Sequence, residues 1–76
     1  MSYELSGAGS ARVRLSVYSV TGQLIRVLVD GVQGPGLHRS RWDGADEDGN
    51  AASSGVYLCQ LAVGARRLVG KMVLVR

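Results

Sequence analysis

The 76-residue sequence lacks the features that several classes of protein require. Its single cysteine, Cys59, cannot form an internal disulfide. No run of 18 apolar residues is present, so no transmembrane helix is expected. The first ten residues, MSYELSGAGS, have neither a charged start nor an apolar core and therefore do not read as a signal peptide. The 11 glycines follow no fixed period, which excludes collagen-like and repeat architectures.

The composition is that of one small folded domain, and we expect it to span residues 1–76. Apolar residues make up 46% and charged residues 20%, with a mean hydropathy of +0.10. The net charge of +3 is mildly basic, and the cations do not form the dense clusters of a nucleic-acid-binding protein. A binder of single strands would pair a basic sheet face with stacking aromatic rings, and only Tyr18 is available for that. No nucleic-acid partner is expected.

Alternation of apolar and polar residues, which is typical of half-buried strands, dominates the sequence. Within residues 11–20, Val13, Leu15 and Val17 fall on one face. The nearly all-apolar residues 24–30 predict a more central strand. No segment has the 3.6-residue period of an amphipathic helix.

Turn signals every 8–12 residues separate the expected strands. Further strands are expected at residues 2–6, 37–43, 55–63 and 67–76. Trp42 marks the core side of its strand, and Tyr57 and Cys59 share a face of theirs. Six strands at this spacing predict an antiparallel β-sandwich or a small barrel.

The stretch WDGADEDGNAASSGVY, residues 42–57, concentrates four acids in one connection. Placing Gly49 at the sixth position of a calcium-binding EF-hand loop puts Asp46 and Asp48 on ligand positions. Positions 1 and 12 are then glycines, so the first ligand and the bidentate glutamate are missing. The favoured interpretation is a connection shaped by Asp and Asn side chains that bond their own backbone. An irregular calcium site remains open.

No catalytic, cofactor-binding or metal-binding residue is assigned from the sequence. His38, Ser40 and Asp43 are the residue types of a catalytic triad, but nothing suggests an oxyanion hole or a pocket beside them. Metal binding by His38 and Cys59 would need two more ligands. Cys59 is expected to be a buried thiol, with an intermolecular disulfide as the alternative.

Longer patterns resemble two related bacterial families. GLHRSRWDGADEDGN, followed by SGVYLCQL and then KMVLVR, resembles the immunoglobulin-like module of the flagellar hook-capping protein. It resembles still more closely the C-terminal sorting domain of type IX secretion cargo. VRLSVYSVTGQLIRVLVDG is similar to the second and third strands of both families. The resemblance covers residues 11–76 and implies an immunoglobulin-like, fibronectin III-like antiparallel β-sandwich of about six to seven strands.

The resemblance also implies roles for individual residues. Trp42 would anchor the core. The residues that would shape the loop and begin the next strand are Asp43, Gly44, Asp46, Gly49, Gly55 and Tyr57. In the sorting family a Gly-x-Tyr element and a lysine of the last strand belong to the recognised region, which here gives Gly55, Tyr57 and Lys71. From the terminal position of the last two strands, we also expect recognition by backbone edge pairing, with Lys71 and Arg76 as charged contacts.

Two features favour the sorting family. The sequence stops within five residues of Lys71, and it reads SGVY where the hook-capping module more usually has D-G-x-Y. Sorting domains usually have a fuller first strand than SYELS, which suggests truncation at about residues 2–6.

We therefore expect a non-enzymatic C-terminal module with no cofactor and no membrane insertion. It would direct a larger exported protein through the periplasm and the type IX secretion system to the cell surface or the medium. Its partners would be proteins of the secretion machinery or neighbouring domains. The alternative is a structural assembly module, as in hook capping.

Overall fold

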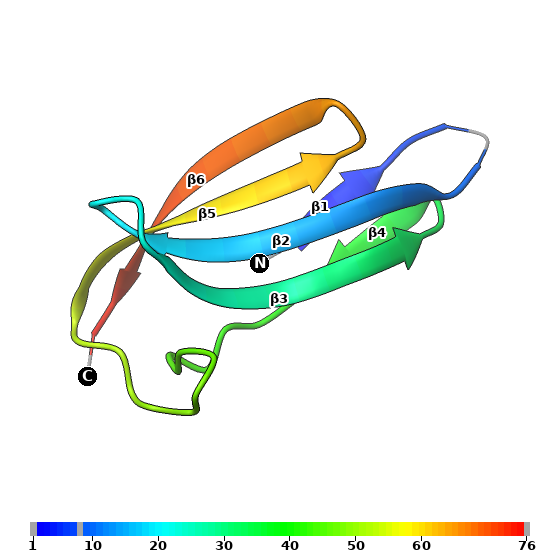
Figure 1. Cartoon of the computed structure of the whole chain (residues 1–76). Coiled ribbons are helices and arrows are strands. Elements are labelled where there is room, and N and C mark those ends of the chain that lie inside the picture. The colour runs from blue at the N-terminus through cyan, green and yellow to red at the C-terminus, as the bar shows by residue number, and fades with distance from the viewer. Residues whose placement is uncertain (1, 8, 76) are drawn as a thin grey trace.

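The computed structural model describes residues 2–7 and 9–75, and these form six β-strands (Figure 1). The strands are β1 (Ser2–Leu5), β2 (Ala11–Ser19), β3 (Leu24–Gln33), β4 (Gly36–Arg39), β5 (Gly55–Val63) and β6 (Arg66–Leu74). Every pairing between them is antiparallel. None of the described residues forms a helix that could cross a membrane.

The strands form two sheets. β3, β2, β5 and β6 make a four-stranded sheet in that order, and β1 pairs with β4 in a second sheet of two strands. The smaller sheet lies behind β2 and β3 in Figure 1, while β6 extends beyond it. The two-sheet, all-β architecture expected from the sequence is confirmed.

The core lies between the sheets and is centred on β2. The residues of β2 predicted to share a buried face, Val13, Leu15 and Val17, are all 0% exposed. Leu15 lies opposite Leu61 of β5, and Val17 lies opposite Cys59. We call this side of the four-stranded sheet the inner face and the opposite side the outer face.

The prediction that residues 24–30 form a central strand is wrong. β3 is an edge strand whose only partner among the described strands is β2, and most of its side chains are half-buried. β2 is the central strand because it pairs with both β3 and β5. A continuous apolar run indicates that both faces of a strand are partly covered, but it does not reveal how many strands pair with it.

The prediction of a strand over residues 37–43 is correct only for its first part. β4 ends at Arg39, which pairs with Ser2, the first described residue of β1. Beyond Arg39, no described residue of β1 remains to continue the ladder. Trp42 consequently lies in the connection between β4 and β5 instead of on a strand.

Candidate functional site

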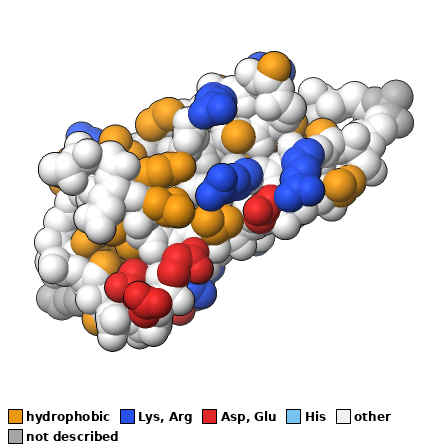
Figure 2. Space-filling view, viewed as in Figure 1, with side chains coloured by type: hydrophobic (Ala, Val, Ile, Leu, Met, Phe, Trp, Pro, Cys, Tyr) orange, Lys and Arg blue, Asp and Glu red, His pale blue; other side chains and the backbone are white. Residues whose placement is uncertain are grey.

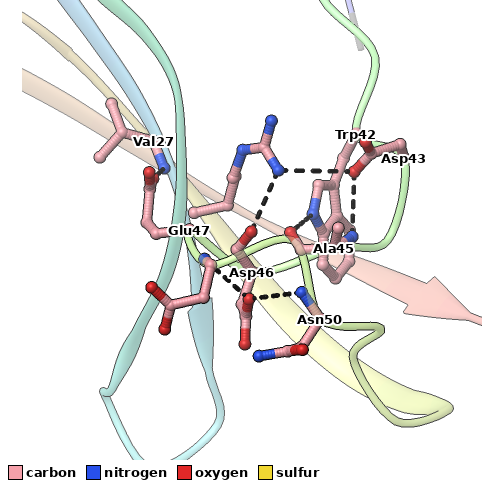
Figure 3. Close-up of polar contacts among 9 residues, drawn as sticks. Val27, Trp42, Asp43, Ala45, Asp46, Glu47 and Asn50 are labelled. Carbon is pink, nitrogen blue, oxygen red and sulfur yellow. Dashed lines mark hydrogen bonds and ion pairs between the residues drawn. The ribbon is translucent and has the colours of Figure 1, made fainter.

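The acidic connection between β4 and β5 is folded around the carboxylate of Asp46 (Figure 3). Asp46 Oδ1 accepts hydrogen bonds from the backbone N–H groups of Asp48 and Asn50, each at 2.9 Å. The backbone N–H of Asp46 donates to the Asn50 carbonyl at 2.9 Å, and the Gly49 N–H donates to the Asp46 carbonyl at 3.1 Å. Gly49 has a φ of 85°, a conformation that favours glycine. The Asp46 side chain is therefore used to hold its own loop.

Asp43 and Trp42 fix the start of the same connection. Asp43 Oδ1 accepts the backbone N–H of Ala45 at 2.9 Å, an Asp turn of the kind expected from the sequence. Trp42 Nε1 donates to the Ala45 carbonyl, also at 2.9 Å (Figure 3). Gly44 has a φ of 80°, and its carbonyl accepts the N–H of Ala52 at 2.8 Å. These bonds close residues 44–52 into a compact loop.

Glu47 attaches this loop to the free edge of β3. Its backbone N–H donates to the Ile25 carbonyl at 3.1 Å, and its carboxylate accepts the backbone N–H of Val27 (Figure 3). Arg26 donates to the Asp46 carbonyl at 3.1 Å and lies 3.8 Å from Asp43 Oδ1. The loop thus occupies edge groups of β3 that could otherwise pair with another strand.

Two aromatic rings join the ends of the connection. The rings of Trp42 and Tyr57 meet edge to face, with centroids 5.0 Å apart and planes at 68°. The Tyr57 hydroxyl donates to the Ser53 carbonyl at 2.6 Å. Gly55, with a φ of 154°, begins β5 two residues before Tyr57. The structure therefore brings Trp42 and Tyr57 together, although they are 15 residues apart in the sequence.

Asp43, Asp46 and Glu47 each use one carboxylate oxygen to accept a backbone N–H. Calcium sites need six to eight oxygen ligands around one point. Among the described residues, no group of three or more His, Cys, Asp or Glu side chains is placed to hold a metal ion. The geometry favours an architectural loop, the first of the two interpretations drawn from the sequence.

His38 is held in a structural position. Its ring stacks on Tyr3 across the β1–β4 pair, with centroids 5.5 Å apart and planes at 20°. Its Nε2 atom lies 2.8 Å from the Gly34 carbonyl. The ring is thus used for cross-strand packing.

Of the residues predicted for sorting recognition, Gly55 and Tyr57 lie at the start of β5, whereas Lys71 lies on β6. Lys71 is exposed on β6, opposite Leu58 of β5. Arg76 lies outside the described residues. Cys59 is buried, as expected, and faces Gly70 of β6. The sequence reasoning placed Lys71 in a strand but assigned no role to the apolar residues around it.

Two features of the site were not found from the sequence. Glu47 and Arg26 join the loop to β3, and no local pattern identifies such a contact across some twenty residues. The second is the exposure of the apolar side chains of β6, among them Leu68 and Val69 at 61% and 65%. The sequence signal that could have indicated this exposure is the presence of apolar residues on both faces of the segment RLVGKMVLVR.

Comparison with known families gives a match over most of the chain. The family model described as FlgD Ig-like domain matches residues 2–66, which include β1 to β5 and the first residue of β6. Searches among curated proteins and among solved structures gave no match. The match and the two antiparallel sheets together confirm an immunoglobulin-like β-sandwich. They give no support to the resemblance to the type IX sorting domain.

Proposed function

This chain belongs to the FlgD Ig-like domain family, and we propose that it acts as a non-enzymatic structural module that packs against other protein subunits in an assembly. The observation that carries the proposal is the family match over residues 2–66. Ig-like domains are generally non-catalytic structural modules.

Acidic side chains of the loop bond to the chain's own backbone, which favours a binding surface over a reaction site. Asp43, Asp46 and Glu47 each accept a backbone N–H of the chain itself. Exposed apolar side chains gather on β6 instead, where Leu68, Val69 and Val73 are 61–65% exposed. An edge strand with exposed apolar side chains is a template for pairing with a strand of another protein. The partners proposed here are therefore proteins.

Sorting through the type IX system remains the second candidate. The observation that favours it is the exposed position of Lys71 on the last strand, where a secretion receptor could reach it. In that case the partner would be the secretion machinery. The parent protein would then pass through the periplasm to the cell surface or the medium. The family match favours assembly over this alternative.

One fusion protein separates the two functions. A fluorescent reporter with a signal peptide is joined to residues 1–76 and expressed in a bacterium with a type IX system, beside a mutant without the outer-membrane pore. An assembly module should leave the reporter in the periplasm of both strains, with the domain folded as judged by protease resistance. Reporter at the surface or in the medium only when the pore is present would overturn the proposal. Deletion of residues 71–76 should then abolish that export.

A further inference from the structure

We infer that the free edge of β6 binds an extended segment of an acidic partner protein, which adds a strand to the four-stranded sheet. This inference rests on the proposed function, because it names the surface and the partner chemistry through which the module would assemble. The acidic side chains of the added strand would face Arg67 and Lys71.

The two edges of the four-stranded sheet differ. At the β3 edge, the backbone and side chain of Glu47 bond to Ile25 and Val27. At the β6 edge, the described part of the chain supplies no strand beyond β6. Alternate N–H and C=O groups of an edge strand point away from its sheet and can pair with an added segment. Among the described residues, the β6 edge therefore has a longer stretch of unpaired backbone groups than the β3 edge.

β6 also carries apolar side chains on both of its faces. Leu68 lies on the inner face opposite Leu61, while Val69 and Val73 lie on the outer face. These three side chains are 61%, 65% and 65% exposed, and Val75 just beyond the strand is 82% exposed. An added strand would cover part of this surface on each face, and the area removed from water would favour binding.

The charge of β6 determines which partner fits. β6 carries Arg66, Arg67 and Lys71, and its neighbour β5 carries no charged residue. Within the described chain, none of these three cations has a carboxylate within 4.0 Å. By contrast, Arg12 of β2 and Asp30 of β3, which share the outer face, lie 2.7 Å apart. Figure 2 shows the outer face, where apolar side chains lie between Lys and Arg side chains and acids gather mainly at the loop.

A second copy of the chain is a poor occupant of this edge. Two β6 strands would bring their Arg67 and Lys71 side chains together with no acid among them. Like charges on adjacent strands are destabilising, whereas opposite charges contribute favourably. An acidic strand gains from the same cations that repel a second copy. The fitting segment has acids at two positions four residues apart, with apolar residues on its other face.

A synthetic peptide tests this surface. The probe is the capped, fluorescently labelled peptide Thr-Val-Ile-Glu-Val-Thr-Val-Glu-Thr, which in antiparallel pairing would place its acids opposite Lys71 and Arg67. Two matched peptides replace both acids by lysine or N-methylate the backbone groups that face β6. Binding to the 76-residue chain is followed by fluorescence anisotropy, and amide NMR shifts locate it. The acidic peptide should bind, shift β6 amides and lose affinity on N-methylation.

Charge reversal in the protein completes the test. Arg67→Glu with Lys71→Glu should weaken binding of the acidic peptide by about tenfold and create binding of the lysine peptide. Arg39→Glu with Arg41→Glu is the matched control on another part of the surface and should change neither affinity. NMR spectra confirm that each variant is folded.

The inference is overturned if the acidic peptide does not bind. It is also overturned if binding ignores the charge reversal, or if the chain dimerises through β6. If the acidic peptide does not bind but the domain is still needed for a larger assembly, the assignment of the β6 edge is wrong and the proposed function stands. Loss of that assembly role would instead contradict the proposed function.

Discussion

The indole ring of Trp42 meets the phenol ring of Tyr57 edge to face, with centroids 5.0 Å apart. Each residue also bonds to a backbone carbonyl inside the connection, Trp42 to Ala45 and Tyr57 to Ser53. The pair therefore fastens both ends of the acidic connection to the sandwich. These contacts explain how a glycine-rich, acidic loop is held in place at both of its ends.

Removal of the Trp42 ring should destabilise the domain strongly for its size. Trp42→Ala loses the contact with Tyr57 and the hydrogen bond to the Ala45 carbonyl. We expect the free energy of unfolding to fall by about 2–3 kcal/mol, below the full range for buried Trp because this ring is half-buried. Trp42→Phe retains an aromatic ring and should lose about 1 kcal/mol. Urea unfolding measures both, and an unchanged midpoint for Trp42→Ala would refute the anchoring role.

Asp46 should stabilise the loop through its acceptor oxygen. Asp46→Ala removes the acceptor of the Asp48 and Asn50 N–H groups and should lower the free energy of unfolding by about 1–2 kcal/mol. Asp46→Asn keeps an oxygen that can accept the same bonds and should cost less. Equal losses for the two variants in thermal unfolding would show that charge, and not the acceptor, is what matters.

The same variants separate an architectural loop from a calcium site. With an architectural loop, millimolar calcium leaves the midpoint of thermal unfolding unchanged in the wild type. A calcium-dependent rise that disappears in Asp46→Ala would establish a metal site instead.

Glu47 should protect one specific backbone group on β3. Its carboxylate accepts the N–H of Val27, so Glu47→Ala should accelerate hydrogen exchange at that amide while the centre of β2 stays protected. Asp48→Ala is the matched control, because the Asp48 side chain makes no hydrogen bond in the described structure. If both variants accelerate Val27 equally, the carboxylate contact is not the cause.

Whether a feature of this fold could be predicted depends on how far apart in the sequence the residues that determine it lie. The alternation around Val13, Leu15 and Val17 identified the buried face correctly, because the side chains of a strand alternate whatever the strand pairs with. The place of residues 24–30 in the sheet was misjudged, because strand order is set by contacts far away in the sequence. The strand through Trp42 was misjudged for the same reason, since its ladder ends at Arg39, which pairs with Ser2 at the start of β1.

In the acidic loop, too, the local contacts could be predicted and the long-range ones could not. The Asp43 turn is local and was expected from residue type alone. The docking of Glu47 on Val27 spans 20 residues and depends on how the loop folds back on β3. Sequence patterns therefore predicted the loop as an architectural element but not the strand edge that it covers.

Substitutions at Gly70 and Cys59 should have non-additive effects on the free energy of unfolding. A Cβ atom added at Gly70 would lie 3.2 Å from Cys59 Sγ, which is closer than ordinary contact. Gly70→Ala should therefore be less favourable in the wild type than in a Cys59→Ala background, with a coupling energy of about 1 kcal/mol. A double-mutant cycle from chemical unfolding measures this energy. Additive effects would mean that the thiol moves aside without cost.

The most direct test of the assembly function is the native mass, in its source cell, of the protein that contains this domain. The protein is tagged at the chromosomal gene and compared with a version that lacks only residues 1–76, using native electrophoresis of gently lysed cells. The account predicts that the tagged protein runs in a complex larger than its own mass, and that the complex is lost when the module is removed. A complex of unchanged composition without the module, or a monomer in both strains, would contradict it.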